Sequence, residues 1–270
     1  MAYKSLLTII SDCASVAQVL AVSTALAQRE EAHLDVLCVG VQGGQSSEAL
    51  GAKLGVAALE LLVTTQLAEA GGRATVENVA LHACGLAELV ARQARFSDLV
   101  ILAKPYGNHA PALAALLAEA ALFRAKVPVL ILPPSRSLFA VEAVALGQHV
   151  VVGWNQSAAA LAAIRAALPL LRAAVHVTIA IVDPQPDSVE RSDPGGALSQ
   201  MLAWHGVRAD VAVLGRSGLV RSRARVADVL ACVLRDKAAD LLVMGAEGLA
   251  LRGTTRDMLE LAEVPVLVAG

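Results

Sequence analysis

The 270-residue sequence has few aromatic side chains, which make up 3% of it, and only four cysteines. Those cysteines (Cys13, Cys38, Cys84 and Cys232) are far apart, without a CxxC pair or the His and Cys spacing of a zinc site. The six histidines are equally scattered. These absences argue against a disulfide framework and against a metal site, and they indicate a cytoplasmic protein with reduced thiols.

The sequence also lacks a large excess of either positive or negative charge. Its 22 basic and 24 acidic residues are mixed along the chain and give a net charge of −2. No basic stripe suited to nucleic acid and no polybasic segment suited to a membrane surface is present. Arg165 and Glu119 interrupt the most apolar stretches, so no run has the length of a membrane span. We therefore expect neither a nucleic-acid partner nor a membrane partner.

Common catalytic motifs are missing as well. The chain has no Walker loop, no GxGxxG fingerprint and no GxSxG elbow, and Ser217 has the wrong spacing for such an elbow. A phosphorylation receiver would need an aspartate near residues 76–80, where none occurs, although Asp12 and Lys104 suit such a domain. We predict no catalytic residues and no dedicated catalysis, while slow ATP hydrolysis incidental to binding stays open.

What the sequence does contain is a duplication. Three pairs of segments repeat each other, and they are 97–102 with 239–244, 127–130 with 264–267, and 6–12 with 149–155. Their spacings of about 142, 137 and 143 residues indicate one unit of roughly 135 residues written twice. The second copy is about five residues shorter between its fourth apolar run and its last.

Short runs rich in Val, Ile and Leu alternate with helical patterns in both copies, which favours a parallel sheet with crossover helices. We predict strands near 4–10, 34–41, 75–80, 98–103 and 128–132, and again near 148–153, 175–182, 209–214, 240–245 and 265–269. The fold class is therefore α/β, with two tandem doubly wound layers. We predict a first domain over 1–134, a linker over 135–147 and a second domain over 148–270.

The second copy resembles the universal stress protein family in its tandem, two-domain bacterial form. Its opening run ends in Gly153-Trp154-Asn155, residues 239–248 end in Gly245-Ala246-Glu247-Gly248, and residues 264–268 close the copy. The resemblance implies two Rossmann-like, open, parallel five-stranded sheets in the order 3-2-1-4-5, with helices on both faces, forming a pseudo-dimer. It also implies a role in stress response.

Nucleotide-binding members of that family carry a glycine pair after the fourth strand, and nine residues later a glycine with Ser or Thr. Small residues of this kind let backbone amides approach phosphates at a helix N-terminus. The resemblance thus implies ATP, with magnesium, or another adenine nucleotide in the second copy. Its candidate residues are Asn155, Val182, Gly245, Gly248, Gly253, Thr254 and Thr255. Only four residues separate Gly248 from Gly253, so the loop is shortened, and Arg252 could offset some lost contacts by its charge.

The first copy departs further from this pattern. Residues 103–109 hold no glycine pair, Ala103 replaces the first glycine, and Pro105 removes a backbone donor. We expect no nucleotide in the first copy, which would be the structural half of the pseudo-dimer.

The apolar last runs, 127–132 and 264–268, carry no charge and would be open edges of their sheets. We predict that the two domains pair within one chain through these strands, and that whole chains form a homodimer. The alternative function is a family member that binds no nucleotide and acts as a dimeric scaffold or partner-binding module.

Overall fold

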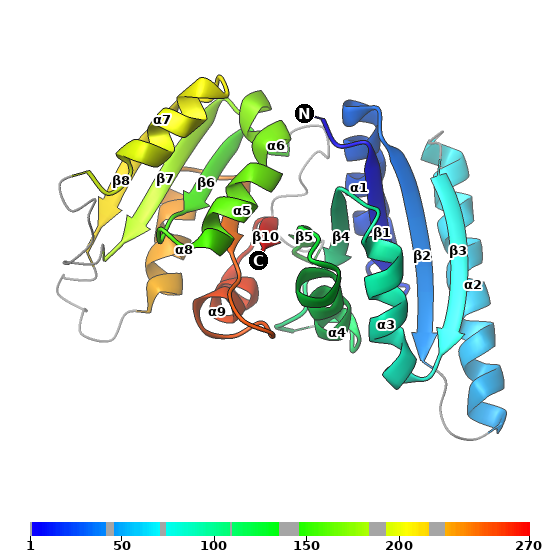
Figure 1. Cartoon of the computed structure of the whole chain (residues 1–270). Helices are drawn as coiled ribbons and strands as arrows, with labels where there is room; N and C mark the ends of the chain where they lie inside the picture. Colours follow the sequence, from blue (N-terminus) through cyan, green and yellow to red (C-terminus); the bar gives the residue numbers. More distant parts are fainter. Residues whose placement is uncertain are drawn as a thin grey trace. The chain divides into compact units, whose positions relative to one another are not determined.

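The computed structural model describes residues 2–41, 46–70, 74–108, 110–134, 146–183, 193–215 and 225–270. Contacts divide the chain into two compact units, Ala2–Val144 and Ala145–Gly270 (Figure 1). Ser217 and most of the predicted linker, residues 135–145, lie outside the described residues. The linker bounds of 135–147 therefore stay a prediction.

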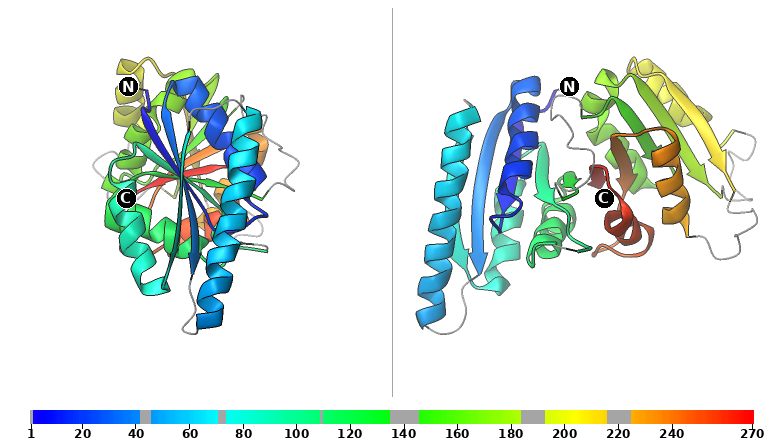
Figure 2. Two further views of the ribbon diagram at one scale, coloured as in Figure 1. Left: turned by 90° about the vertical axis from the view of Figure 1, so that its right-hand side faces the viewer. Right: turned by 180° about the vertical axis from the view of Figure 1, so that it is seen from behind.

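The N-terminal unit is a parallel sheet with the strand order β3-β2-β1-β4-β5. The strands are β1 (Ser5–Ile10), β2 (His33–Val41), β3 (Ala74–Leu81), β4 (Leu99–Ala103) and β5 (Val129–Leu132). The helices are α1 (Val16–Glu30), α2 (Ser46–Ala70), α3 (Ala83–Ala94) and α4 (Ala114–Glu119), which continues into the π-helical turn η1 (Ala120–Ala125). Figures 1 and 2 show α1 and α2 on one face of the sheet and α3 and α4 on the other.

The C-terminal unit repeats this arrangement with the order β8-β7-β6-β9-β10, again all parallel. The strands are β6 (His149–Gly153), β7 (His176–Val182), β8 (Ala209–Leu214), β9 (Leu241–Gly245) and β10 (Val266–Ala269). The helices are α5 (Ala158–Ala166), α6 (Leu168–Ala173), α7 (Gly196–Trp204), α8 (Val226–Asp236) and α9 (Gly253–Leu261). Helices α5 to α7 cover one face, and α8 and α9 cover the other. The predicted α/β class and the order 3-2-1-4-5 are confirmed in each unit.

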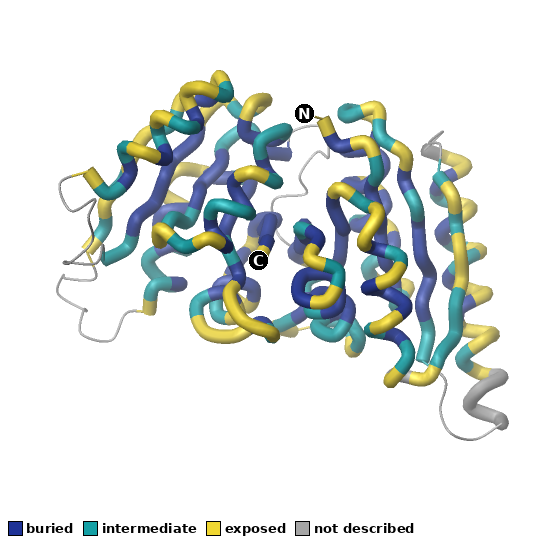
Figure 3. The backbone as a smooth tube through the Cα atoms, viewed as in Figure 1, coloured by how far each residue is buried: buried dark blue, intermediate teal, exposed yellow. Residues whose placement is uncertain are grey.

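The central strands of both sheets are buried on both faces, as Figure 3 shows by their dark colour. Their side chains are Val, Ile and Leu because helices cover each face, and parallel strands of this kind carry near-continuous apolar runs. The outer strands β3 and β8 consist of exposed and half-buried residues only. Within the described part of the chain, no helix has the length and apolar character that a membrane span requires.

An aspartate holds the first strand beside the fourth in each unit. Asp240 accepts hydrogen bonds from three consecutive amides, those of Gly147, Gln148 and His149, at 3.2, 2.8 and 3.1 Å. In the N-terminal unit Asp98 accepts from the amides of Lys4 and Ser5 at 2.7 and 3.0 Å. These bonds lie at the amino ends of the strands and leave the carboxyl ends free to form a site.

Candidate functional site

A pocket of about 320 Å³ lies in the C-terminal unit at the carboxyl ends of β6, β7 and β9. Strand β6 pairs with β7 on one side and with β9 on the other, and the helices after β6 and β9 cover opposite faces of the sheet. This is the topological switch point, where open α/β sheets bind their ligands. The pocket is lined by Gly153, Trp154, Asn155, Ala180, Val182, Val226, Leu230, Met244, Gly245, Glu247, Arg252, Thr254 and Thr255.

One wall of the pocket is apolar. It consists of Ala180 and Val182 at the end of β7, Val226 and Leu230 on α8, and Met244 on β9. Ala180 and Val182 are two residues apart on a strand, so both side chains point to the face that α8 covers. Such a wall suits a flat, weakly polar group such as a nucleobase.

The end of β6 is held by local hydrogen bonds. The amide of Trp154 donates to the carbonyl of Ala180 at 2.9 Å. The Oδ1 atom of Asn155 accepts from the Ser157 amide at 3.2 Å, and the Ser157 hydroxyl accepts from the Ala160 amide at 3.1 Å, which caps α5. The side-chain NH₂ group of Asn155 remains as a donor at the pocket.

Trp154 also contributes a buried polar atom. Its indole Nε1 is shielded from solvent and has no hydrogen-bond partner among the described residues. Buried N–H groups of this kind are normally paired in native proteins. Because this atom is shielded from solvent, its N–H group does not open onto the pocket.

The local backbone structure by itself explains two glycines of the predicted site, Gly245 and Gly248. A Cβ added to Gly245 would lie 2.5 Å from the carbonyl carbon of Ala159 and 2.8 Å from Cα of Ala160, because α5 packs on this point. Gly248 has a φ of +99°, which favours glycine in the turn after β9. The hydroxyl of Thr255 on α9 donates to the Gly245 carbonyl at 3.2 Å. Strand β9 is thus fixed to a helix on each face.

The loop between β9 and α9 contributes two charged side chains to the lining of the pocket. Glu247 and Arg252 both line it, both are exposed, and neither side chain makes an ion pair or hydrogen bond with the described residues. Arg225 at the start of α8 is instead engaged with two carboxylates, those of Asp228 at 3.6 Å and Asp257 at 3.3 Å. The N-terminal end of α9, with Thr254 and Thr255, adds the positive end of a helix dipole.

Five of the seven residues that the sequence predicted for this site line the pocket: Asn155, Val182, Gly245, Thr254 and Thr255. Gly248 and Gly253 belong to the adjoining loop and helix start but are not among the lining residues. The predicted site residues did not include Trp154, the α8 side chains or Glu247. The alternation along β7 could have pointed to Ala180, since it lies two residues before Val182.

The N-terminal unit has a much smaller cavity at the carboxyl ends of β4 and β5. The cavity there measures about 30 Å³ and includes Gln18, Ala103, Lys104 and Pro133 among its lining residues. The Lys104 amide donates to the Leu132 carbonyl at 2.8 Å, and the Gln18 side-chain amide donates to the Pro133 carbonyl. His109 of the predicted loop lies outside the described residues. That this copy binds no nucleotide stays a prediction.

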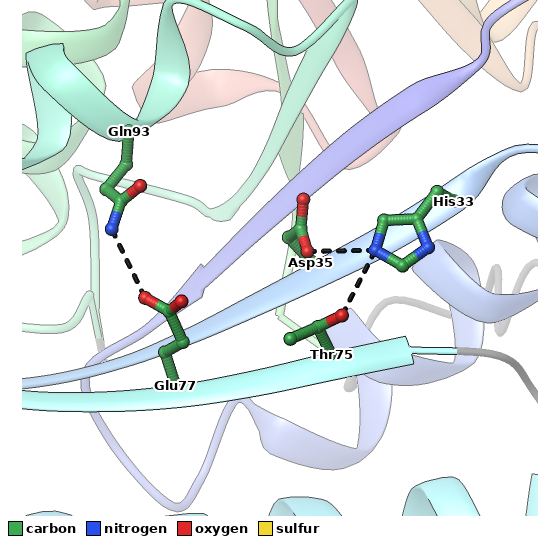
Figure 4. Close-up of polar contacts among 5 residues, drawn as sticks. All are labelled: His33, Asp35, Thr75, Glu77 and Gln93. Carbon is green, nitrogen blue, oxygen red and sulfur yellow. Dashed lines mark hydrogen bonds and ion pairs between the residues drawn. The ribbon is translucent and has the colours of Figure 1, made fainter.

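A second polar cavity, of about 110 Å³, lies in the N-terminal unit between the sheet and α3. Figure 4 shows two hydrogen-bonded groups, of which Asp35, Thr75, Glu77 and Gln93 line this cavity. His33 Nε2 lies 3.0 Å from Asp35 Oδ1 and 3.1 Å from Thr75 Oγ1, and Gln93 Nε2 donates to Glu77 Oε2 at 3.2 Å. These hydrogen bonds connect β2 with β3 and β3 with α3. In the part of the chain that the structure describes, no group of three His, Cys, Asp or Glu residues could hold a metal ion.

No protein-family model and no curated protein matches the sequence. Among solved structures, the fold is similar to a universal stress protein from Archaeoglobus fulgidus, with a TM-score of 0.69 and 14% identity. That match covers 98% of this chain and 97% of the other. A putative universal stress protein from Pseudomonas aeruginosa matches with a TM-score of 0.61 and 16% identity over 99% of this chain and 93% of the other.

A protein of unknown function from the same bacterial species is similar to this chain as well. It has a TM-score of 0.60 and 16% identity, and the match covers 99% of this chain and 92% of that one. All three matches extend over both units. The chain therefore has the fold of universal stress proteins over its whole length, and the predicted resemblance is confirmed for the fold.

Proposed function

We propose that this chain is a stress-response protein of the universal stress type, without dedicated catalysis, and that its C-terminal unit binds an adenine nucleotide. The nucleotide would be ATP with magnesium or a shorter adenine nucleotide. The observation that supports this proposal most strongly is the pocket of about 320 Å³ at the switch point of the C-terminal sheet. Its volume is at the lower end of the range of roughly 300–1,000 Å³ for small-molecule sites.

The apolar wall of the pocket suits a nucleobase, and the start of α9 suits a phosphate group. The nucleobase would lie against the apolar wall of Val182, Val226 and Met244, where the Asn155 NH₂ group is a donor at its edge. The phosphate would lie at the N-terminus of α9, where the first backbone amides of a helix have no partner within that helix. Arg252 would add a positive charge beside those amides.

An alternative function is a scaffold that binds no nucleotide. It is favoured by the packing of Gly245 on α5, which explains this glycine without a ligand, and by the short loop between Gly248 and Gly253. In both functions we propose that β5 and β10 pair the two units within a chain, and that chains form a homodimer in the cytoplasm. Sedimentation equilibrium of the full chain would then give twice the chain mass of 27.8 kDa, whereas a single chain mass would exclude the homodimer.

The nucleotide proposal can be tested on the purified full-length protein. Denaturation followed by mass spectrometry of the supernatant should release adenine nucleotide, or titration with AMP, ADP and ATP, with and without magnesium, should raise the melting temperature. Arg252→Glu should weaken binding by about tenfold or more, since it replaces attraction by repulsion.

Arg208→Glu is the matched control, because Arg208 is exposed and directly precedes β8 at the opposite end of the sheet. It should bind as the wild type does. Absence of any nucleotide and of any thermal shift would leave the scaffold as the function.

A further inference from the structure

The charges at the pocket limit how much phosphate it can hold. Among the described residues that line it, Arg252 carries the only positive side chain and Glu247 the only negative one. Arg225, at the adjacent start of α8, is already engaged with Asp228 and Asp257. The charged side chains among these described lining residues therefore sum to no net charge, and the dipole of α9 supplies about half a positive charge.

The described residues also offer few hydrogen-bond donors at the start of α9. The Thr255 hydroxyl is used by the Gly245 carbonyl, which leaves the Thr254 hydroxyl and the first amides of α9. Gly248 and Gly253, whose amides would have to wrap a longer phosphate chain, do not line the pocket. The available donors suit one phosphoryl group seated on the end of the helix.

We infer that the C-terminal site selects adenosine monophosphate over the di- and triphosphate, because Glu247 repels every phosphoryl group beyond the first. This inference rests on the proposed function. The first phosphoryl group meets Arg252 and the helix N-terminus, while each further one adds negative charge beside an unpaired carboxylate. At a partly exposed site such a repulsion weakens binding by about tenfold.

The test is isothermal titration of the full chain with AMP, ADP and ATP at constant ionic strength, with and without magnesium. AMP should bind about tenfold more tightly than ATP. Glu247→Gln should bring the two affinities together, mainly by strengthening ATP binding. Glu260→Gln removes an exposed carboxylate from the far half of α9 and should keep the wild-type ratio.

The possible failures are distinguishable. If no adenine nucleotide binds at all, the proposed function is wrong. If nucleotides bind but ATP binds as tightly as AMP or more tightly, only the inferred preference for AMP is wrong. A preference for ATP that requires magnesium and is lost in Glu247→Gln would likewise overturn the inference, because Glu247 would then attract the phosphate chain through the metal ion. If Glu247→Gln leaves the ratio of the AMP and ATP affinities unchanged, the role assigned to this carboxylate is wrong.

Discussion

Gly245 lies directly against Ala160, so closely that a Cβ on Gly245 would sit 2.8 Å from the Cα atom of Ala160. The last residue of β9 and the first turn of α5 are therefore in backbone contact, and any side chain at residue 245 would separate them. This contact places the N-terminal turn of α5 beside the pocket. Gly245 thus shapes the site through packing, whether or not its amide contacts a ligand.

The first prediction concerns that contact. Gly245→Ala should lower the free energy of unfolding by about 1–3 kcal/mol, because overpacking displaces α5 or β9. Gly153→Ala is the control, since it also lines the pocket but its added Cβ would meet neighbours no closer than 3.7 Å. Urea unfolding should leave this control within about 0.5 kcal/mol of the wild type. Equal stability of both variants would contradict the packing argument.

The second prediction concerns the other face of β9. Thr255→Val keeps the shape of the side chain but removes the donor to the Gly245 carbonyl, which should cost about 1 kcal/mol of stability. Thr255→Ser keeps the hydroxyl and should lose less, although it removes a buried methyl group. Thermal unfolding of the wild type, Thr255→Ser and Thr255→Val measures the order of their stabilities. A valine variant more stable than the serine variant would show that the hydrogen bond contributes little.

The third prediction is a pH dependence at Asp240. Burial raises the pKa of this carboxyl above its ordinary value, although the three amide hydrogen bonds and His149 act to lower it. The folded chain thus holds the proton more tightly than the unfolded chain. The resulting contribution to stability is complete below the ordinary pKa of about 4 and is lost as pH rises through the raised pKa.

Asp240→Asn does not titrate, so comparing it with the wild type isolates this group. The stability of the wild type relative to the variant should increase as the pH falls from about 7 to about 4. Urea unfolding at a series of pH values measures the difference. If the relative stability instead increases with rising pH, the amide hydrogen bonds outweigh the burial of the carboxylate.

The fourth prediction uses the four cysteines, which are all free thiols. Cys38 is buried on β2, and burial, with a smaller effect of Glu60, raises the pKa of its thiol to about 11. Since only the thiolate reacts, Cys38 should stay unmodified by iodoacetamide in the folded protein near neutral pH. Peptide mass spectrometry should find modification at the exposed Cys13, Cys84 and Cys232. Rapid modification of Cys38 in the folded state would contradict its burial.

Much of the fold was predictable because its signals are periodic. The predicted strand over 209–214 is the observed β8, Ala209–Leu214, and the two sheets have the predicted order. The repeat also holds at the level of pairing: Leu6 lies opposite Leu99 just as Val150 lies opposite Leu241. Apolar runs and turns are local features, so a single sequence carries them.

The walls of the pocket were less predictable, because they depend on which residues of α8 and β7 meet across the fold. Leu230 is an apolar residue of α8, but nothing in the local sequence tells which strand end it covers. Trp154 was noted only as part of a motif, and its unpaired indole N–H depends on the surrounding structure. The aspartates Asp98 and Asp240 stand in the repeated segments, yet their hydrogen bonds to the first strand appear only in three dimensions.

The most direct test of nucleotide binding uses Trp154, which lines the pocket, as a fluorescent reporter. The chain has two tryptophans, and the other, Trp204, is 77% exposed at the end of α7. In Trp204→Phe, titration with AMP should therefore change the fluorescence of Trp154 in a saturable way, with one site per chain. If the fluorescence does not change at concentrations that saturate ordinary nucleotide sites, the C-terminal pocket is not a nucleotide site.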